Sequence, residues 1–270
     1  MKNPMKEEWL SIVLQAAHEA GVAIMKIYAQ PFKVDYKEDD SPLTQADREA
    51  DEIICKHLAQ TGIPILSEEG AKENYETRKN WTLCWIVDPL DGTKEFVKKN
   101  GEFTVNIALV ENGIPMFGVI FAPALGILYY GQKGQGAYKV LIPDLFAKNI
   151  DLRPIASLPT QKFPEKFSVV GSRSHASPET NAYVEELKSQ YGEVDFVTSG
   201  SSLKFCLLAE GKAQVYPRFA PTMEWDTAAG QAILEAAGGT VMDWSTKMPM
   251  VYNRKELLNS WFLAEAKKSE

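Results

Sequence analysis

Segment 85–96 (WIVDPLDGTKEF) constrains this chain most, because an apolar strand runs directly into two carboxylates, a glycine and a hydroxyl. Asp88 and Asp91 flank a Pro-Leu step that cannot continue a strand, so we expect a tight turn that brings both carboxylates to one side. The carbonyl of Leu90 can add a third oxygen ligand. Hard divalent cations such as Mg²⁺ take oxygen ligands of this kind and keep positions for water and phosphate.

The residues that follow this turn suit an anion. Gly92 lets the backbone approach a phosphate closely, and a helix that begins near Thr93 would point free N–H groups at it. The alternative is an ordinary turn without a ligand, since Asp, Pro and Gly are common turn residues. Other segments must decide between the two interpretations.

Composition sets broad limits. With 270 residues, of which 45% are hydrophobic, the chain can bury the core of one large domain or of two subdomains. The net charge of -7 disfavours a nucleic-acid polymer as partner, but a small phosphate ester needs only a local patch of metal, Lys and Arg.

The cysteines and the apolar pattern bear on location. Cys55, Cys84 and Cys206 stand apart in apolar surroundings, so we expect buried reduced thiols, no zinc site and no disulfide. A cytoplasmic location is therefore the default expectation. No apolar stretch reaches 18 residues, so we expect neither a signal peptide nor a membrane-spanning helix.

The hydrophobic pattern divides the chain in two. Steps of three and four predict a helix over 7–29 and a second helix after Thr44, against a largely antiparallel sheet with strands 64–67, 83–87, 105–110, 116–122 and 127–130. After about residue 145, strands and helices alternate, as in an α/β layer. The strands are 167–170, 194–197, 214–216 and 240–242, the helices 178–190, 202–210 and 227–237, and 264–270 is a polar tail.

We therefore expect an N-terminal α+β subdomain over 1–150 that holds the main metal site. A C-terminal α/β subdomain over 151–270 would supply Asp226 and contacts to the substrate. The proline-containing segment 152–164 is the expected seam, and the site would lie in a cleft between the halves.

Four acids outside segment 85–96 are candidates. Glu68 and Glu69 follow a strand, where either could bind metal or act as a base. The alternative is a solvated charged turn, which explains Glu69 taken alone equally well. Asp47 fits a capping box with Thr44, which would account for it entirely. Asp226 could complete the metal shell from the second half or simply cap its helix.

Hydroxyl and basic residues in the second half suggest a second anion site. Ser201, Ser202 and Lys204 open a helix, with capping and a solvated lysine as the alternative. Ser172, His175 and Arg218 stand at strand ends, where loop residues without a ligand are the simpler interpretation.

Taken together, the motifs resemble those of a known family. Asp88-Pro89-Leu90-Asp91-Gly92-Thr93, the upstream Glu68-Glu69 and the downstream segment 225–230 (WDTAAG) resemble the inositol monophosphatase-like, lithium-sensitive, Mg²⁺-dependent phosphatases over nearly the whole chain. Within that superfamily, Lys94-Glu95-Phe96 and segments 101–106, 172–175, 200–205 and 216–219 are similar to 3'(2'),5'-bisphosphate nucleotidases of the CysQ type.

The resemblance implies a layered αβαβα sandwich and two or three Mg²⁺ ions. It implies metal ligation by the carboxylates of Glu68, Asp88, Asp91 and Asp226 and by the carbonyl of Leu90. It places Asp47 and Thr93 beside the attacking water, with Glu68 also in the catalytic set. The substrate contacts that it implies are Gly92, Thr93, Lys94, Ser172, His175, Ser201, Ser202, Lys204, Arg218 and Asp226.

The expected activity is hydrolysis of the 3'-phosphate of adenosine 3',5'-bisphosphate (PAP), with its sulfated relative PAPS as a further substrate. The alternatives are an inositol monophosphatase or fructose-1,6-bisphosphatase with the same metal chemistry, and a catalytically silent metal or nucleotide sensor. An aspartyl-phosphate phosphatase does not fit, because Asp88 and Asp91 are three apart rather than two. The expected partner is a small phosphorylated nucleotide, and we expect a monomer or a homodimer. The resemblance also admits a peripheral position at the inner membrane.

Overall fold

The structure, a computed structural model, describes residues 5–36, 42–70, 73–147, 150–171 and 177–267. The helices are α1 (Glu7–Tyr28), α2 (Gln45–Leu58), η1 (Ala59–Thr61), α3 (Tyr75–Arg78), α4 (Thr93–Val97), α5 (Pro178–Tyr191), α6 (Leu203–Glu210) and α7 (Glu224–Ala236). The strands are β1 (Val34–Tyr36), β2 (Pro42–Thr44), β3 (Ile65–Ser67), β4 (Leu83–Asp91), β5 (Thr104–Glu111), β6 (Ile114–Ala122), β7 (Ile127–Gln132), β8 (Gly136–Leu141), β9 (Ala156–Ser157), β10 (Phe167–Gly171), β11 (Val194–Thr198), β12 (Val215–Arg218), β13 (Thr240–Asp243) and β14 (Phe262–Glu265).

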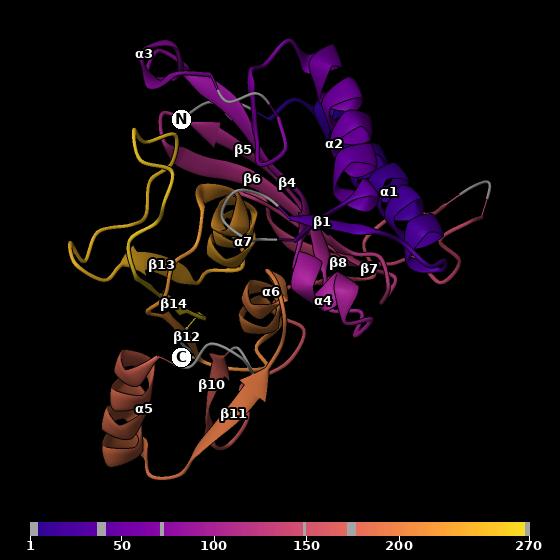
Figure 1. Cartoon of the computed structure of the whole chain (residues 1–270). Helices are drawn as coiled ribbons and strands as arrows, with labels where there is room; N and C mark the ends of the chain where they lie inside the picture. Colours follow the sequence, from indigo (N-terminus) through magenta and orange to yellow (C-terminus); the bar gives the residue numbers. More distant parts are fainter. Residues whose placement is uncertain (1–4, 37–41, 71–72, 148–149, 172–176, 268–270) are drawn as a thin grey trace.

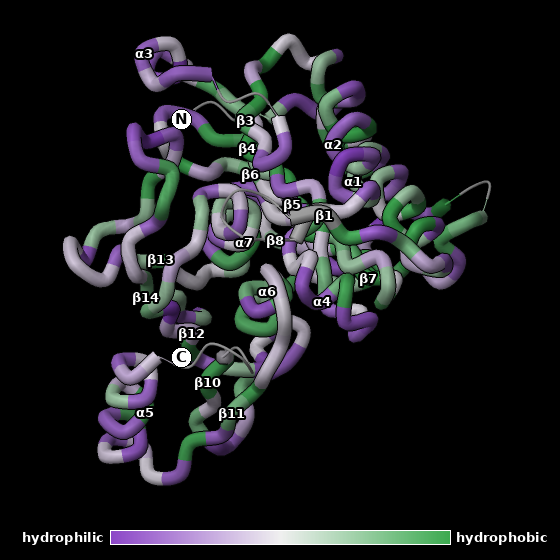
Figure 2. The backbone as a smooth tube through the Cα atoms, in the orientation of Figure 1, coloured by the Kyte–Doolittle hydropathy of each residue, from purple (hydrophilic) through white to green (hydrophobic). Residues whose placement is uncertain are grey.

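These elements form five layers. Helices α1 and α2 cover one face of a seven-stranded sheet, α6 and α7 lie between that sheet and a five-stranded one, and α5 packs on the outer side (Figure 1). The layered αβαβα fold expected from the resemblance is confirmed. Figure 2 shows that the strands of the larger sheet are mainly hydrophobic, whereas α5 and α3 at the edges carry many hydrophilic residues.

The seven-stranded sheet has the order β3-β4-β5-β6-β7-β8-β9. Only β3 and β4 are parallel, so the prediction of a largely antiparallel sheet is confirmed. Strand β9 lies beyond residue 150 and still pairs with β8. The subdomain boundary near residue 150 stays a prediction.

Helix α1 is long and apolar enough to cross a membrane by length and composition alone. Its apolar face is explained by packing, since Val13, Ala17 and Ile24 are fully buried in the cluster that α1 and α2 share with the sheet. Such a buried stripe is typical of a core helix. The prediction of a helix over 7–29 is confirmed to within one residue.

The five-stranded sheet has the order β11-β10-β12-β14-β13. Strand β14 contradicts the prediction of a polar tail from residue 264, because it pairs antiparallel with both β12 and β13. Phe262 and Ala264 are fully buried there. A strand of four residues gives too short an alternation to identify from sequence.

Helix α7 approaches the larger sheet so closely that glycine is required beneath it. A Cβ atom on Gly118 of β6 would lie 2.4 Å from the carbonyl oxygen of Ala229, and one on Gly131 of β7 would lie 2.7 Å from Cα of Ile233. Backbone atoms of a buried helix cannot rotate away as a flexible side chain can. These two glycines therefore fix the depth at which α7 packs and the position of Asp226 in its first turn.

We expect Gly118→Ala to lower the free energy of unfolding by about 1–3 kcal/mol through overpacking. Gly134→Ala is the comparison, because Gly134 has open space around it but a positive φ of 77°, so that variant reports backbone strain alone. Urea unfolding of both variants checks the prediction. A smaller loss for Gly118→Ala than for Gly134→Ala would contradict the close approach of α7.

Candidate active site

A bulge in β4 brings the first two acids together. Asp88 pairs with Asn106 of β5 and Asp91 with Thr104, so β4 has one residue more than β5 between these pairs. In a regular strand, side chains three positions apart point to opposite faces, and one extra residue corrects this. The prediction that Pro89-Leu90 ends the strand was wrong: β4 continues to Asp91. A proline is tolerated at a bulge, where its missing N–H breaks no ladder bond.

Asp226 joins these two acids from α7. Carboxylate oxygens of Asp88, Asp91 and Asp226 all lie within 4.8 Å of one another. Asp88 is 1% exposed, and its Oδ1 accepts a hydrogen bond from the backbone N of Leu90 at 3.0 Å. Asp226 also accepts a bond from the backbone N of Met223 at 2.8 Å, so it anchors the helix start and belongs to the cluster at once.

The cluster concentrates negative charge in a buried place. Burial, followed by the neighbouring carboxylates of Glu68 and Asp91, raises the pKa of Asp88 well above its usual range. Burial and the charge of Asp91 raise the pKa of Asp226 to about 8. Among the described residues, no Lys or Arg forms an ion pair with Asp88, Asp91 or Asp226. An all-oxygen cluster with this charge fits a hard divalent cation.

Glu68 borders the cluster. It follows β3, which pairs parallel with β4, and its backbone N donates to the carbonyl of Val87 at 3.1 Å. Its charge contributes to the raised pKa of both Asp88 and Asp226. The pKa of Asp47 is also raised. Burial is the largest cause, and the negative charge of Glu69 adds to it.

Asp47 combines the two roles that the sequence left open. Its Oδ2 accepts from the backbone N and from Oγ1 of Thr44, both at 2.7 Å, which completes the capping box of α2. Its Oδ1 accepts from Oγ1 of Thr93 at 3.2 Å. Thr93 begins α4 directly after Gly92, whose φ of 89° is the left-handed region that glycine tolerates. The cap therefore holds an acid against the threonine at the cluster.

Ser202 ties the cluster to α6. Its Oγ lies 2.8 Å from Oδ2 of Asp91 and 2.6 Å from the backbone oxygen of Asp226, and it accepts from Nδ2 of Asn106 at 3.0 Å. It makes no side-chain capping bond, although it stands at the N-cap of α6. Its position therefore links β4, β5, α6 and α7.

A cavity of about 130 Å³ opens beside the cluster, between the two sheets. Lys204 lines it, 7% exposed, with its ammonium 2.6 Å from the carbonyl oxygen of Ser201 and 3.4 Å from that of Ser199. Burial lowers the pKa of Lys204 to about 8, against the opposing effect of Asp91. The structure therefore contradicts the alternative that Lys204 is a solvated lysine.

Two further donors in this cavity lack partners. Oγ of Ser201 and Nε of Arg218 are buried without a hydrogen bond to any described residue, and both residues line the cavity. Arg218 also donates from Nη2 to the carbonyl of Pro221 at 3.0 Å. Buried donors without partners are uncommon, so these two are candidates for contacts to a ligand that accepts hydrogen bonds.

The structure separates the predicted contacts into three groups. Gly92, Ser201, Ser202, Lys204, Arg218 and Asp226 all line the cavity, and Thr93 lies beside it, next to Gly92 but not among the lining residues. Lys94 is exposed and is not among the lining residues. Ser172 and His175 lie outside the described residues.

Sequence analysis missed several residues of the site. Glu95 and Thr222 line the cavity, and Oε2 of Glu102 accepts from the backbone N of Gly200 at 2.9 Å. Asn106 contacts Asp91 and Ser202. Thr104 and Asn106 are buried polar residues at alternate positions of an otherwise apolar strand, and that pattern was the available signal.

Comparisons with known proteins agree with this geometry. The model of the inositol monophosphatase family matches residues 5–269. The 3'(2'),5'-bisphosphate nucleotidase CysQ of Salmonella typhimurium is 46% identical over 257 residues, which cover 94% of this chain and 98% of that protein. The CysQ protein of Escherichia coli K12 is 45% identical over 258 residues, with the same coverage. A crystal structure of CysQ from Bacteroides thetaiotaomicron has a TM-score of 0.85 and 50% identity, over 96% of this chain and 97% of that one. The chain therefore belongs to the inositol monophosphatase family.

Proposed function

We propose that this protein hydrolyses the 3'-phosphate of adenosine 3',5'-bisphosphate to AMP and inorganic phosphate, with PAPS as a further substrate. One observation carries this proposal: the acid cluster lies directly beside a cavity that is lined by Lys204, Arg218 and Ser201. Together, the cluster with its metal and the cavity would offer two adjacent places for anions. The names of the CysQ relatives support the same substrate class. The buried, unpaired thiols of Cys84 and Cys206 support a reducing, cytoplasmic setting.

Glu68, Asp88, Asp91, Asp226 and the carbonyl of Leu90 would hold the metal, which we propose to be Mg²⁺. When bound, such ions neutralise the phosphate, lower the pKa of water and stabilise the departing oxygen.

The chain's own groups orient the reaction. Oγ1 of Thr93 lies 3.2 Å from Oδ1 of Asp47 and 3.3 Å from the carbonyl oxygen of Leu90. With Leu90 bound to the metal, Thr93 would donate its hydroxyl proton to Asp47, and its lone pairs would accept a hydrogen bond from the attacking water. In the reaction, the water oxygen forms a bond to phosphorus, the bond from phosphorus to the 3'-oxygen breaks, and a proton passes to that oxygen. Backbone N–H groups of Gly92 and Thr93 would hold the phosphate. Lys204, Arg218 and Ser201 would hold the second phosphate.

The direct test is phosphate release from PAP, with inositol 1-phosphate and fructose 1,6-bisphosphate in parallel, in the presence of Mg²⁺ and then with added Li⁺. We expect fast release from PAP that Li⁺ inhibits. Preference for a sugar phosphate would leave the metal site in place and overturn the proposed substrate. Mg²⁺-dependent nucleotide binding without release would identify a sensor.

Asp47→Asn and Thr44→Ala separate the two roles of Asp47. We expect Asp47→Asn to lower kcat by about 10²–10⁴-fold, the range for loss of a positioned acid–base partner. Thr44→Ala removes the cap hydroxyl but keeps the contact between Asp47 and Thr93, so it should lower stability by about 1 kcal/mol with kcat largely retained. Steady-state kinetics and urea unfolding on both variants check this. Equal losses of kcat would mean that Asp47 acts only through the helix cap.

Asp226→Asn tests the charge of the cluster. The raised pKa of Asp226 contributes stability that is fully present below its unfolded value of 3.8 and is lost as pH rises through about 8. We therefore expect the metal-free protein to melt at lower temperature at pH 9 than at pH 6, and the increase in Tm with Mg²⁺ to grow over that range.

In Asp226→Asn both effects should shrink and turnover should fall sharply. Asp195→Asn, on an exposed position of β11, is the matched control and should behave as the unchanged protein. A full Mg²⁺ response in Asp226→Asn would remove this residue from the metal site.

Lys204→Met tests the second anion site. We expect the KM for PAP to rise about tenfold or more with little change in kcat, the effect of losing one charged hydrogen-bond partner. The KM for 3'-AMP, which lacks the 5'-phosphate, should stay constant. Because the pKa of Lys204 is about 8, the preference for PAP over 3'-AMP should also weaken above that pH. Equal changes on both substrates would place the 5'-phosphate elsewhere.

A further inference from the structure

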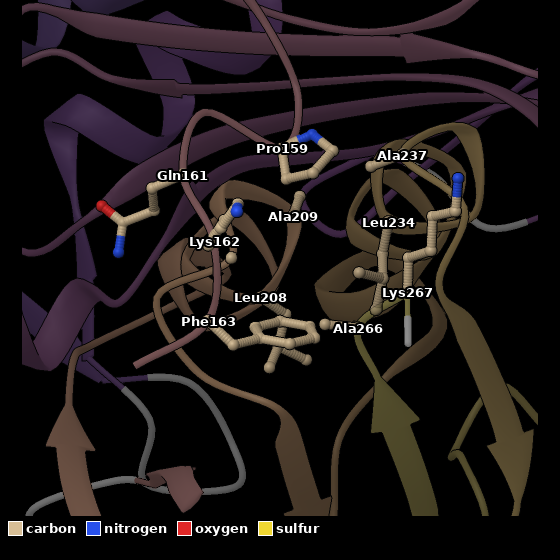
Figure 3. Close-up of a pocket in the computed structure, with 11 residues that line it drawn as sticks. Pro159, Gln161, Lys162, Phe163, Leu208, Ala209, Leu234, Ala237, Ala266 and Lys267 are labelled. Atoms are coloured by element: carbon tan, nitrogen blue, oxygen red, sulfur yellow. The ribbon is translucent and has the colours of Figure 1, made fainter. Parts of the chain in front are cut away.

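A second cavity, of about 290 Å³, lies at the ends of α6 and α7 that face away from the acid cluster (Figure 3). Its lining is mainly apolar and comprises Pro159, Phe163, Leu208, Leu234, Ala237 and Ala266. Of its lining residues, none takes part in the proposed reaction. The cavity is therefore a feature of the fold that the proposed function does not use.

The cavity is formed by fixed backbone. The loop after β9 crosses the end of α6, where the backbone N atoms of Thr160 and Gln161 both donate to the carbonyl of Glu210, at 3.2 and 3.3 Å. A Cβ on Gly211 would lie 2.5 Å from the carbonyl oxygen of Gln161, so the loop and the helix end are in close contact. The carboxylate of Glu210 is itself bound by Lys139 and Lys212, each at 2.5 Å. A preformed cavity costs little to organise when a ligand binds.

Two lysines give the cavity a charge. Lys162 and Lys267 both line it and are exposed, and neither ammonium has a hydrogen bond or ion pair with a described residue. The alkyl chain of Lys267 lies over the end of α7, since a Cβ on Gly238 would meet its Cδ at 2.8 Å. Long basic side chains often cover apolar surface while the charged group stays in water. An apolar interior with two cations at its rim matches an amphipathic anion.

The volume limits the size of the apolar part. It is roughly twice the ~150 Å³ of an engineered cavity that binds benzene, which corresponds to about two fused rings. Figure 3 shows the ring of Phe163 lying between Leu208 and Ala266, where it offers an aromatic face. Most ligand sites share this combination of an apolar interior and a few polar groups.

We propose that this cavity is a second binding site, distinct from the proposed active site, for a small amphipathic organic anion with a flat apolar body of about two rings and one carboxylate or similar group. Phe163 and the ends of α6 and α7 contact the body. Lys162 and Lys267 contact the anionic group.

The test measures the binding of the probe 2-naphthoate to the whole chain by isothermal titration calorimetry, in the presence of Mg²⁺. The cation 2-naphthylmethylamine has the same ring system and the opposite charge. We expect 2-naphthoate to bind with one-to-one stoichiometry and at least about tenfold more tightly than the amine. Equal affinity, or no binding of 2-naphthoate at millimolar concentration, would overturn the proposal.

Variants locate the binding. The double variant Lys162→Met with Lys267→Met should lower the affinity for 2-naphthoate about fivefold to tenfold. The control is the double variant Lys56→Met with Lys255→Met, which removes the same charge from exposed positions outside the cavity and should leave the affinity unchanged. Ala237→Met fills the cavity and should abolish binding. Melting temperature and phosphatase activity verify that each variant folds.

Asp226→Asn separates the two sites, because it disables the proposed active site and should retain full affinity for 2-naphthoate. Loss of binding in Asp226→Asn, or full binding in Ala237→Met, would place the anion in the active site and refute a second site.

Discussion

Mutual repulsion among the carboxylates of Asp88, Asp91 and Asp226 is the constraint that the surrounding structure accommodates. Like charges within 4.8 Å of one another are unfavourable in a partly buried setting, and burial raises the pKa of Asp88 and Asp226. The fold places them together by a bulge in one strand and by a helix, α7, from the layer between the two sheets. That arrangement is unfavourable for the metal-free chain and favourable for one that binds a divalent cation, which is why the cluster is the centre of the proposed function.

The helix pair α6 and α7 connects this cluster to the rest of the molecule. Phe205 of α6 packs so tightly on α7 that a Cβ on Gly230 would lie 2.3 Å from its ring. The same α7 rests on Gly118 and Gly131 of the larger sheet. Both helices begin at the acid cluster and end at the second cavity. The two helices therefore form one closely packed unit, with the acid cluster at one end and the second cavity at the other.

Much of the fold followed from the sequence, and the errors have identifiable causes. Helix α1 and strands β5 and β6 carry long, strongly periodic patterns, and they were predicted nearly to the residue. Strand β14 was missed because four residues give too little periodicity. The end of β4 was wrong because proline was taken as a strand terminator, although a bulge removes the need for its N–H. Asn106 and Glu102 were missed as site residues because their roles depend on partners distant in sequence.

The sequence by itself determined the chemistry available: acids around a strand end, a glycine before a helix, and hydroxyl and basic residues at helix starts and strand ends. Those are local properties, fixed by residue type and spacing. The cap that Asp47 forms followed from the local sequence, but tertiary structure alone decided that the same carboxylate contacts Thr93, that Ser202 joins Asp91 to α7, and that Lys204 is buried. The contacts from Asp47 to Thr93 and from Ser202 to Asp91 join residues 46 and 111 positions apart, and no local pattern of side chains specifies them or the burial of Lys204.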